Sequence, residues 1–441
     1  MKKRRFVLTA LCTLPLLAFS EGFSLKQCID YADKANGNIV NAGYDVEIAG
    51  RKVKEQIGTI LPQIDGSASY QDKLLIGKTV IHFGGVDQAM PFGKKHNMSG
   101  SVQLTQKLFD PTFPLVLKAS KISEDQAQQS LKMTKEQAAY SISLTYFQTL
   151  VIGKQMSTLH STLNTSGNLL KSTELRFQAG MAKQIDVDKI RVSYNNLESQ
   201  VQQSELNLAQ SLNNLKYYMG MPVESVIALT DSVMNVDNQT LEELISDFNL
   251  ENRTDYQLQK IAVKAFEADK SRNQVGYLPT LNFSADLGGM GTSDKFNLLN
   301  GGGYWFPNSA LTFSLRVPIF DGLQRQQRIA QANLNIQKSK VKMAQSEQSI
   351  RLDLSNYENQ YRTAVNNIKN EKENLTLSES VYKNTQLQYQ EGMASSLELV
   401  QVESSYNEST NNYYAKLLNL YIARINLEQG KGNLLNYINN K

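Results

Sequence analysis

The chain has 441 residues, of which 41% are hydrophobic, and it carries 46 Lys and Arg against 42 Asp and Glu. Four of the bases lie between Lys2 and Arg5, so 42 bases face 42 acids in the rest of the chain. This balance favours neither nucleic acid nor an acidic partner. The histidines form no ligand cluster, and the chain contains no phosphate-binding glycine loop and no nucleophile with a base. We therefore predict no metal, no cofactor and no catalytic residue.

Residues 1–20 have the pattern of a secretory signal peptide, because four bases precede an apolar run from Phe6 to Phe19. Ala18-Phe19-Ser20 is a suitable cleavage site. After it, no apolar stretch reaches about 18 residues, the length of a membrane-spanning helix. If the chain enters a membrane, it must therefore do so as a closed β-barrel. Cys28 remains without a partner cysteine, and we expect it to be buried in helix packing rather than redox-active.

The chain repeats itself once, and this repeat predicts the architecture. Leu61-Pro62 recurs as Leu278-Pro279, and Leu108-Phe109-Asp110 recurs as Ile319-Phe320-Asp321. Each half is expected to contain a helix, a strand, a loop, a strand, a very long helix, a glycine turn and a shorter helix. The predicted segments are a first repeat at 21–220, a linker or equatorial segment at 221–250, a second repeat at 251–430 and a tail at 431–441.

The predicted strands alternate between apolar and polar residues, as at Ala310 to Ile319. Polar positions such as Lys107 and Arg316 would line water, although a soluble half-buried sheet would show the same pattern. Four strands per chain cannot close, since the smallest membrane barrels have about eight. Three chains would supply twelve strands through heterologous contacts, which predicts a homotrimer in outer-membrane lipid. Gly77 to Asn97 and Gly288 to Asn308 would then be outer loops.

The helical segments are too long for an ordinary domain. No proline interrupts Thr112 to Phe177 or Gly322 to Tyr389, apart from Pro114 at the start of the first, and each predicts a helix of about 65 residues, roughly 100 Å long. Their partners are shorter, and helices from Leu25 to Ile60 and from Arg253 to Tyr277 would stack end to end with those partners. The apolar positions follow coiled-coil spacing, while the other faces are uncharged and polar, which suits a tube wetted on both sides. The fold class is thus α+β: a twelve-stranded barrel continuous with a helical coiled-coil barrel.

One motif appears twice, as Arg176-Phe177-Gln178-Ala179-Gly180-Met181-Ala182 and as Gln388-Tyr389-Gln390-Glu391-Gly392-Met393-Ala394. With this pair and the duplicated halves, the chain resembles the outer membrane efflux protein family over essentially its whole length after residue 20. Each glycine allows the positive φ that ends a helix. The acid six residues later, Asp186 or Glu398, lies early in the next helix, where a purely structural role as a cap would also explain it.

The resemblance implies that the two turns form a periplasmic tip that closes a tunnel. Gly180, Met181, Gly392 and Met393 would dock an adaptor, and Tyr389 would bind Asp186 as a gate latch. Glu398 would form a ring of acids that favours cations. The sequence departs from the family pattern at two positions. Ala394 replaces an arginine of the latch, which implies either a looser latch or a substitute in Lys183 or Arg176. Gln401 replaces a second acid, which implies weaker cation selectivity.

The predicted function is a passive outer-membrane exit duct, extending into the periplasm, of a tripartite efflux or type I secretion system. Its expected partners are a periplasmic adaptor protein and an inner-membrane transporter of the RND or ABC type, with no nucleic acid. One alternative is a secreted coiled-coil structural protein or adhesin. Another is a hydrolytic enzyme using His82, His96 and Asp87, although solvated loop residues account for these three better.

Overall fold

The structure is a computed structural model that describes residues 22–231 and 248–439. The predicted signal peptide at 1–20, most of the linker after residue 231 and residues 440–441 lie outside the described residues. The described chain divides into two compact units. The first, called the helical unit, takes residues from 1–43, 131–255 and 346–441, and the second, called the sheet unit, consists of 44–130 and 256–345.

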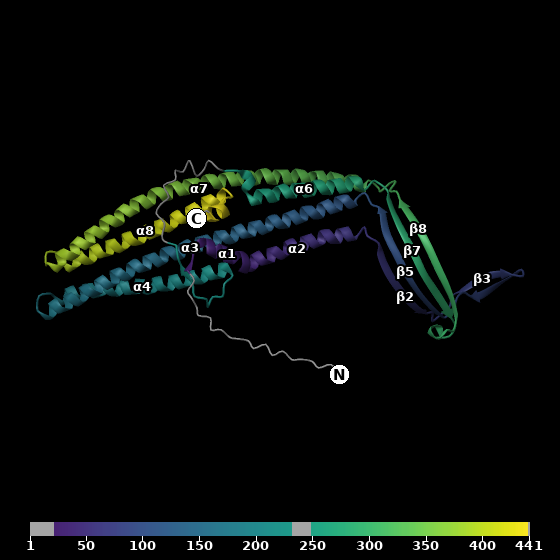
Figure 1. The fold of residues 1–441 in the computed structure, drawn as a ribbon, viewed down its shortest axis with the longest axis horizontal. Helices are drawn as coiled ribbons and strands as arrows, with labels where there is room; N and C mark the ends of the chain where they lie inside the picture. Colours follow the sequence, from purple (N-terminus) through teal and green to yellow (C-terminus); the bar gives the residue numbers. More distant parts are fainter. Residues whose placement is uncertain (1–21, 232–247, 440–441) are drawn as a thin grey trace, which may run out of the picture. The chain divides into compact units, whose positions relative to one another are not determined.

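The sheet unit contains a four-stranded antiparallel sheet in the order β2-β5-β7-β8 (Figure 1). Its strands are β2 (Gln63–Asp72), β5 (His96–Phe109), β7 (Thr280–Ser293) and β8 (Tyr304–Arg316). The register confirms the predicted alternation, because paired residues share a face. One row joins Thr105, Ser284 and Thr312, and the next joins Leu104, Ala285 and Leu311. Around these rows the sheet therefore has one polar and one apolar face, whereas further along the polar face Met290 pairs with Phe306.

The predicted outer loops were too long. Residues from Gly288 to Ser293 complete β7, and Tyr304 to Asn308 begin β8, which ends at Arg316 rather than Ile319. Glycine here does not mark a loop: a Cβ at Gly291 would lie 2.8 Å from the Trp305 ring, so the glycine makes room for the ring within the ladder.

The other predicted loop, Gly77 to Asn97, holds a hairpin of β3 (Lys78–Phe83) and β4 (Val86–Pro91). Gly84 and Gly85 turn this hairpin with φ of +66° and +83°, values that suit a two-residue hairpin loop. His82 and Asp87 bind each other across it at 2.6 Å, whereas His96 lies in β5 and contacts Tyr70, so the three residues do not form one site.

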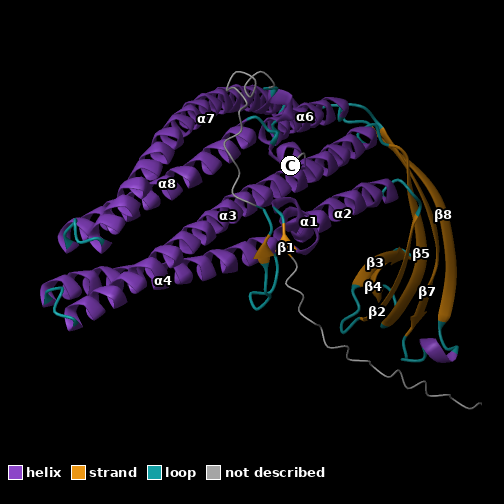
Figure 2. Ribbon diagram, turned by 60° about the vertical axis from the view of Figure 1, so that its left-hand side comes forward, coloured by secondary structure: helices purple, strands orange, loops and turns teal. Residues whose placement is uncertain are grey.

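The long helices have the predicted lengths. α3 (Phe113–Gln178) has 66 residues and α7 (Gln324–Gln390) has 67, while their partners α4 (Gln184–Met219) and α8 (Ser396–Gly430) have 36 and 35. Within the helical unit, α3 runs beside α4 and α7 beside α8 (Figures 1 and 2). The remaining helix of the second half is α6 (Thr254–Val275). No helix within residues 22–231 and 248–439 is long and apolar enough to cross a membrane.

The first predicted helix, Leu25 to Ile60, is divided into α1 (Leu25–Ala35) and α2 (Gly37–Gly58). Asn36 causes the break, because its backbone is extended and its Oδ1 accepts hydrogen bonds from the N–H groups of Asn38 and Ile39. A side chain that caps the next helix competes with continuation of the previous one.

The main core of the helical unit gathers α1, α3, α4, α7, α8 and the short α9 (Leu434–Asn439). Phe147 stacks on Tyr421 with ring centroids 4.5 Å apart, and Cys28 is fully buried, as expected. Burial raises the pKa of the Cys28 thiol to about 12. Two short parallel strands, β1 (Gly22–Phe23) and β6 (Ala228–Leu229), bring the described start of the linker against this core.

Candidate functional site at the hairpin tips

The α3–α4 and α7–α8 turns lie at the same end of the helical unit (Figure 2). Gly180 and Gly392 have φ of +74° and +79°, as the sequence predicts. Met181 N–H donates to Arg176 C=O at 2.8 Å, and Met393 N–H donates to Gln388 C=O at the same distance. Both turns are therefore Schellman motifs, which satisfy the last carbonyls of the helix. The two methionine side chains project outward, with 76% and 70% of their surface exposed.

The two acids after the turns lie in the first turn of the next helix. Asp186 Oδ2 accepts from Lys183 N–H at 3.3 Å, while the Glu398 N–H donates to the Ser395 hydroxyl at 3.1 Å. An acid near a helix N-terminus is stabilised by the helix dipole. Asp186 therefore has a capping role, whereas Ser395 supplies the cap at Glu398 and leaves the exposed Glu398 carboxylate available for another role.

Three side chains connect the hairpins at the tip. The Ser396 hydroxyl donates to Asp186 Oδ1 at 2.5 Å. Arg176 of α3 donates to the carbonyls of Tyr389, at 3.3 Å, and of Gln390, both at the end of α7. The Tyr389 hydroxyl lies 3.3 Å from Thr173 Oγ1. These bonds join segments more than 200 residues apart in the sequence.

Asp186 and Tyr389, which the resemblance pairs as a latch, thus each contact the opposite hairpin. Among the described residues, however, no hydrogen bond joins Asp186 to Tyr389. Asp186 is bonded to Ser396 instead, and Tyr389 to Thr173. Arg176, named as a possible substitute for the missing arginine, holds the C-terminus of α7, where a cation is favoured. Nothing in the sequence singled out Thr173 or Ser396, because small hydroxyl residues are abundant in these helices.

Below the turns the hairpins share a small second core of Leu169, Ile190, Tyr382, Tyr389 and Leu399. A carboxyl group borders this core: Glu403 of α8 is 2% exposed and accepts from the Ser193 hydroxyl at 2.7 Å. Burial raises the pKa of Glu403 above its usual range. Sequence reasoning missed this residue, although it lies four positions after Leu399 on the apolar side of α8, where a buried acid could have been suspected.

The predicted lumen residues lie on the polar face of the sheet. Lys107 pairs with Asn282 across the ladder and places its Nζ 3.4 Å from Asp110, while Arg316 lies opposite Thr280 at the end of β8. The register therefore puts both cations on the face that carries Thr105 and Ser284.

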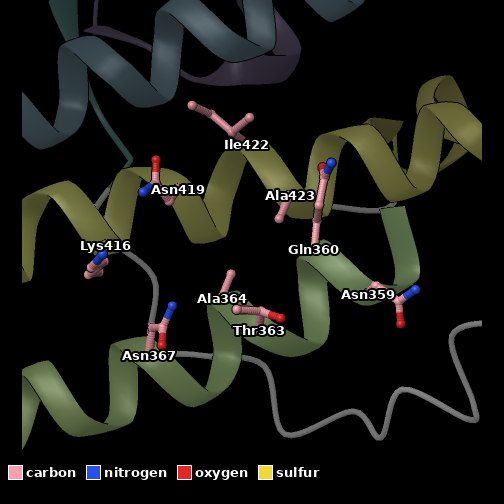
Figure 3. A pocket seen from close by; sticks show the side chains of 9 residues that line it. All are labelled: Asn359, Gln360, Thr363, Ala364, Asn367, Lys416, Asn419, Ile422 and Ala423. Carbon is pink, nitrogen blue, oxygen red and sulfur yellow. The ribbon is translucent and has the colours of Figure 1, made fainter. Parts of the chain in front are cut away.

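A groove of about 440 Å³ lies between α7 and α8 (Figure 3). The residues that line it include Asn359, Gln360 and Ala364 of α7 and Asn419 and Ala423 of α8. Within the described residues, no group of three or more His, Cys, Asp or Glu could hold a metal ion.

Comparison with known proteins decides the family. The model of the Outer membrane efflux protein family matches residues 29–221 and 246–433. The chain belongs to the outer membrane efflux protein family. This efflux protein is therefore an outer-membrane protein that extends into the periplasm, from a family of channels rather than enzymes. A secreted coiled-coil protein or adhesin would not match this family over both halves.

Sequence relatives agree with this assignment. The chain is 20% identical over 448 residues to the outer membrane protein TolC of Escherichia coli, covering 98% of the chain and 87% of that protein. It is 19% identical over 434 residues to TolC of Vibrio cholerae, covering 97% and 94%.

Solved structures show the same fold. VceC of Vibrio cholerae has a TM-score of 0.70 and 14% identity, covering 92% of this chain and 96% of that one. The CmeC outer membrane channel of Campylobacter jejuni has a TM-score of 0.71 and 15% identity, covering 93% and 86%. The predicted family and its helix-rich α+β fold are confirmed.

Proposed function

We propose that this efflux protein is the exit duct of a tripartite efflux or type I secretion system. Three copies would form one tunnel, and substrates would pass through it passively from an inner-membrane pump. The observation that carries this proposal is the sheet, which has two faces of opposite polarity and, within the described residues, an outer strand at each edge that pairs on one side only.

The apolar face of the sheet is uncovered in the single chain. Leu311, Phe313 and Leu315 of β8 are 74%, 67% and 65% exposed, far more than water-facing residues of this size should be. The apolar face would contact lipid, because the opposite face is polar and can contact water. Lys107 and Arg316 would then point into the lumen.

The edges of the sheet require closure by other copies. Within the described residues β2 pairs only with β5, and β8 only with β7. Free backbone groups are not tolerated in hydrocarbon, so β8 of one copy would pair with β2 of the next. Three copies give a closed twelve-stranded barrel with heterologous contacts, in keeping with the family.

The hairpin tips would form the gated periplasmic entrance. The Asp186–Ser396 bond, the Arg176 contacts and the Tyr389–Thr173 contact would hold the hairpins together, and Glu398 would form the cation-favouring ring. The exposed Met181 and Met393 on the turns of Gly180 and Gly392 would meet the adaptor. Flexible thioether side chains suit such a docking surface. Energy for transport would come from a partner transporter of the RND or ABC type.

Cysteine cross-linking between sheet edges tests the assembly. Ser67→Cys on β2 is combined in turn with Ser309→Cys, Thr312→Cys and Ser314→Cys on β8, because a disulfide forms only where Cα atoms come within about 7 Å. We expect at least one pair to give covalent products that stop at three chains. The matched control replaces the β8 cysteine with Ser284→Cys on the central strand β7, which should give none. Products that stop at two chains, or no products from any pair in membrane-inserted protein, would contradict the proposal.

A further inference from the structure

Glu403 lies where all four tip helices meet. Its carboxyl group accepts hydrogen bonds from Ser193 of α4 at 2.7 Å and from Tyr382 of α7 at 3.5 Å. Glu403 itself belongs to α8, and Ser166 of α3 lies beside it. One carboxyl group therefore bridges the α3–α4 hairpin and the α7–α8 hairpin from inside.

The groups facing this carboxyl are neutral. From α3 and α4 they are the hydroxyls of Ser166 and Ser193, and from α7 the phenol of Tyr382, which stacks on Tyr406 of α8 at 5.3 Å. Lys383 and Glu379 of α7 form an exposed ion pair at 2.6 Å that acts on Tyr406. Among the described residues, no ion pair includes Glu403.

An ionised carboxylate in this position loses hydration without gaining a cation. Burial raises the pKa of Glu403, and the hydroxyls of Ser193, Ser166 and Tyr382 offset only part of that increase. A neutral carboxyl could keep its acceptor oxygen for Ser193. Its own proton could go to Ser166 Oγ, which is buried and makes no hydrogen bond of ordinary length within the described residues.

We propose that Glu403 is a proton-binding site that links pH to the contact between the two hairpins. With a proton bound, the hairpins pack together at the tip; loss of the proton favours their separation. The consequence for gating rests on the proposed channel function, whereas the link between proton and packing does not.

Proton binding to Glu403 and packing of the hairpins favour each other. The packed tip holds the proton more tightly than the separated hairpins, in which Glu403 is hydrated. Packing is therefore strongest at low pH and weakens as pH rises from the ordinary range of a carboxyl group to its raised pKa. A single proton changes the packing equilibrium by at most about tenfold per pH unit across that window, and by nothing above it.

Hydrogen exchange of the purified membrane-inserted protein tests this link. The amide exchange rates of peptides from 160–200 and 380–410 are measured from about pH 5 to about pH 8. Each rate is divided by the rate of the same peptide in Glu403→Gln at the same pH, because this ratio cancels the dependence of amide exchange chemistry on pH. We expect Glu403→Gln to stay protected throughout, and the native tip to exchange up to about tenfold faster per pH unit. Glu408→Gln removes an exposed acid from the same helix and should behave as the native chain does.

Ser193→Ala supplies a second test that does not depend on the glutamine variant folding. Removing this donor takes away a bond that favours the ionised form, so the loss of protection should move to higher pH. A native profile without pH dependence, or a Glu403→Gln tip that exchanges faster at every pH, would overturn the inference. A conducting trimer with a flat exchange profile would refute this inference alone. A pH-linked tip in a protein that never conducts would refute the channel alone.

Discussion

Removing the Ser396 hydroxyl should loosen the tip without disturbing either helix start. Ser396 is 4% exposed and donates to Asp186 at 2.5 Å, so Ser396→Ala deletes one contact between the hairpins. Asp186→Ala would be a poorer probe, because Asp186 also accepts from Lys183 N–H. A hydrogen bond to a charged acceptor contributes about 1.5 to 3 kcal/mol, or about ten- to a hundredfold in the separation of one hairpin pair.

The neighbouring serine provides the control. Ser395 caps α8 through the Glu398 N–H, so Ser395→Ala should cost about 1 kcal/mol of helix stability while leaving the bond between hairpins intact. In planar bilayers we expect Ser396→Ala to spend at least about ten times longer in a wider conducting state than the native protein. If Ser395→Ala opened the channel as much as Ser396→Ala, helix fraying rather than the Asp186 contact would control the tip, and our reasoning would fail.

Three further predictions follow from single residues. Gly180→Ala and Gly392→Ala should each lower stability by about 1 to 2 kcal/mol in thermal unfolding because of their positive φ, whereas Gly153→Ala, inside α3, should raise it slightly. Glu398→Gln should reduce the cation preference of the open channel measured from reversal potentials, and an unchanged preference would remove Glu398 from the selectivity ring. Cys28, whose thiol is buried with a pKa of about 12, should react with maleimide only after denaturation; labelling of the native protein at neutral pH would contradict its burial.

Features that depend on local patterns were predictable from the sequence. The near-absence of proline and the spacing of apolar residues gave α3 and α7 to within a few residues, because helix length is set locally. Gly180 and Gly392 were predictable for the same reason, since the positive φ that ends a long helix favours glycine.

Features that depend on contacts between distant segments were not predictable. The partners Ser396 and Thr173 face their counterparts only once the two hairpins are side by side, and one sequence carries no sign of that. The glycines of β7 resembled a loop because the groups next to them come from other strands, as the Trp305 ring of β8 does at Gly291. The β3–β4 hairpin, by contrast, could have been found, since Gly84-Gly85 between two short runs that contain β-branched and apolar residues is a hairpin signal.

The measurement that tests the central claim most directly is the conductance of the purified native protein in a planar bilayer. A trimeric tunnel closed at its tips should give small, regular, cation-preferring current steps, because the Glu398 ring and the narrow entrance limit the flow. If the protein neither inserts nor conducts and stays in solution as a single chain, the apolar face of the sheet does not meet lipid. The exit duct would then be the wrong function.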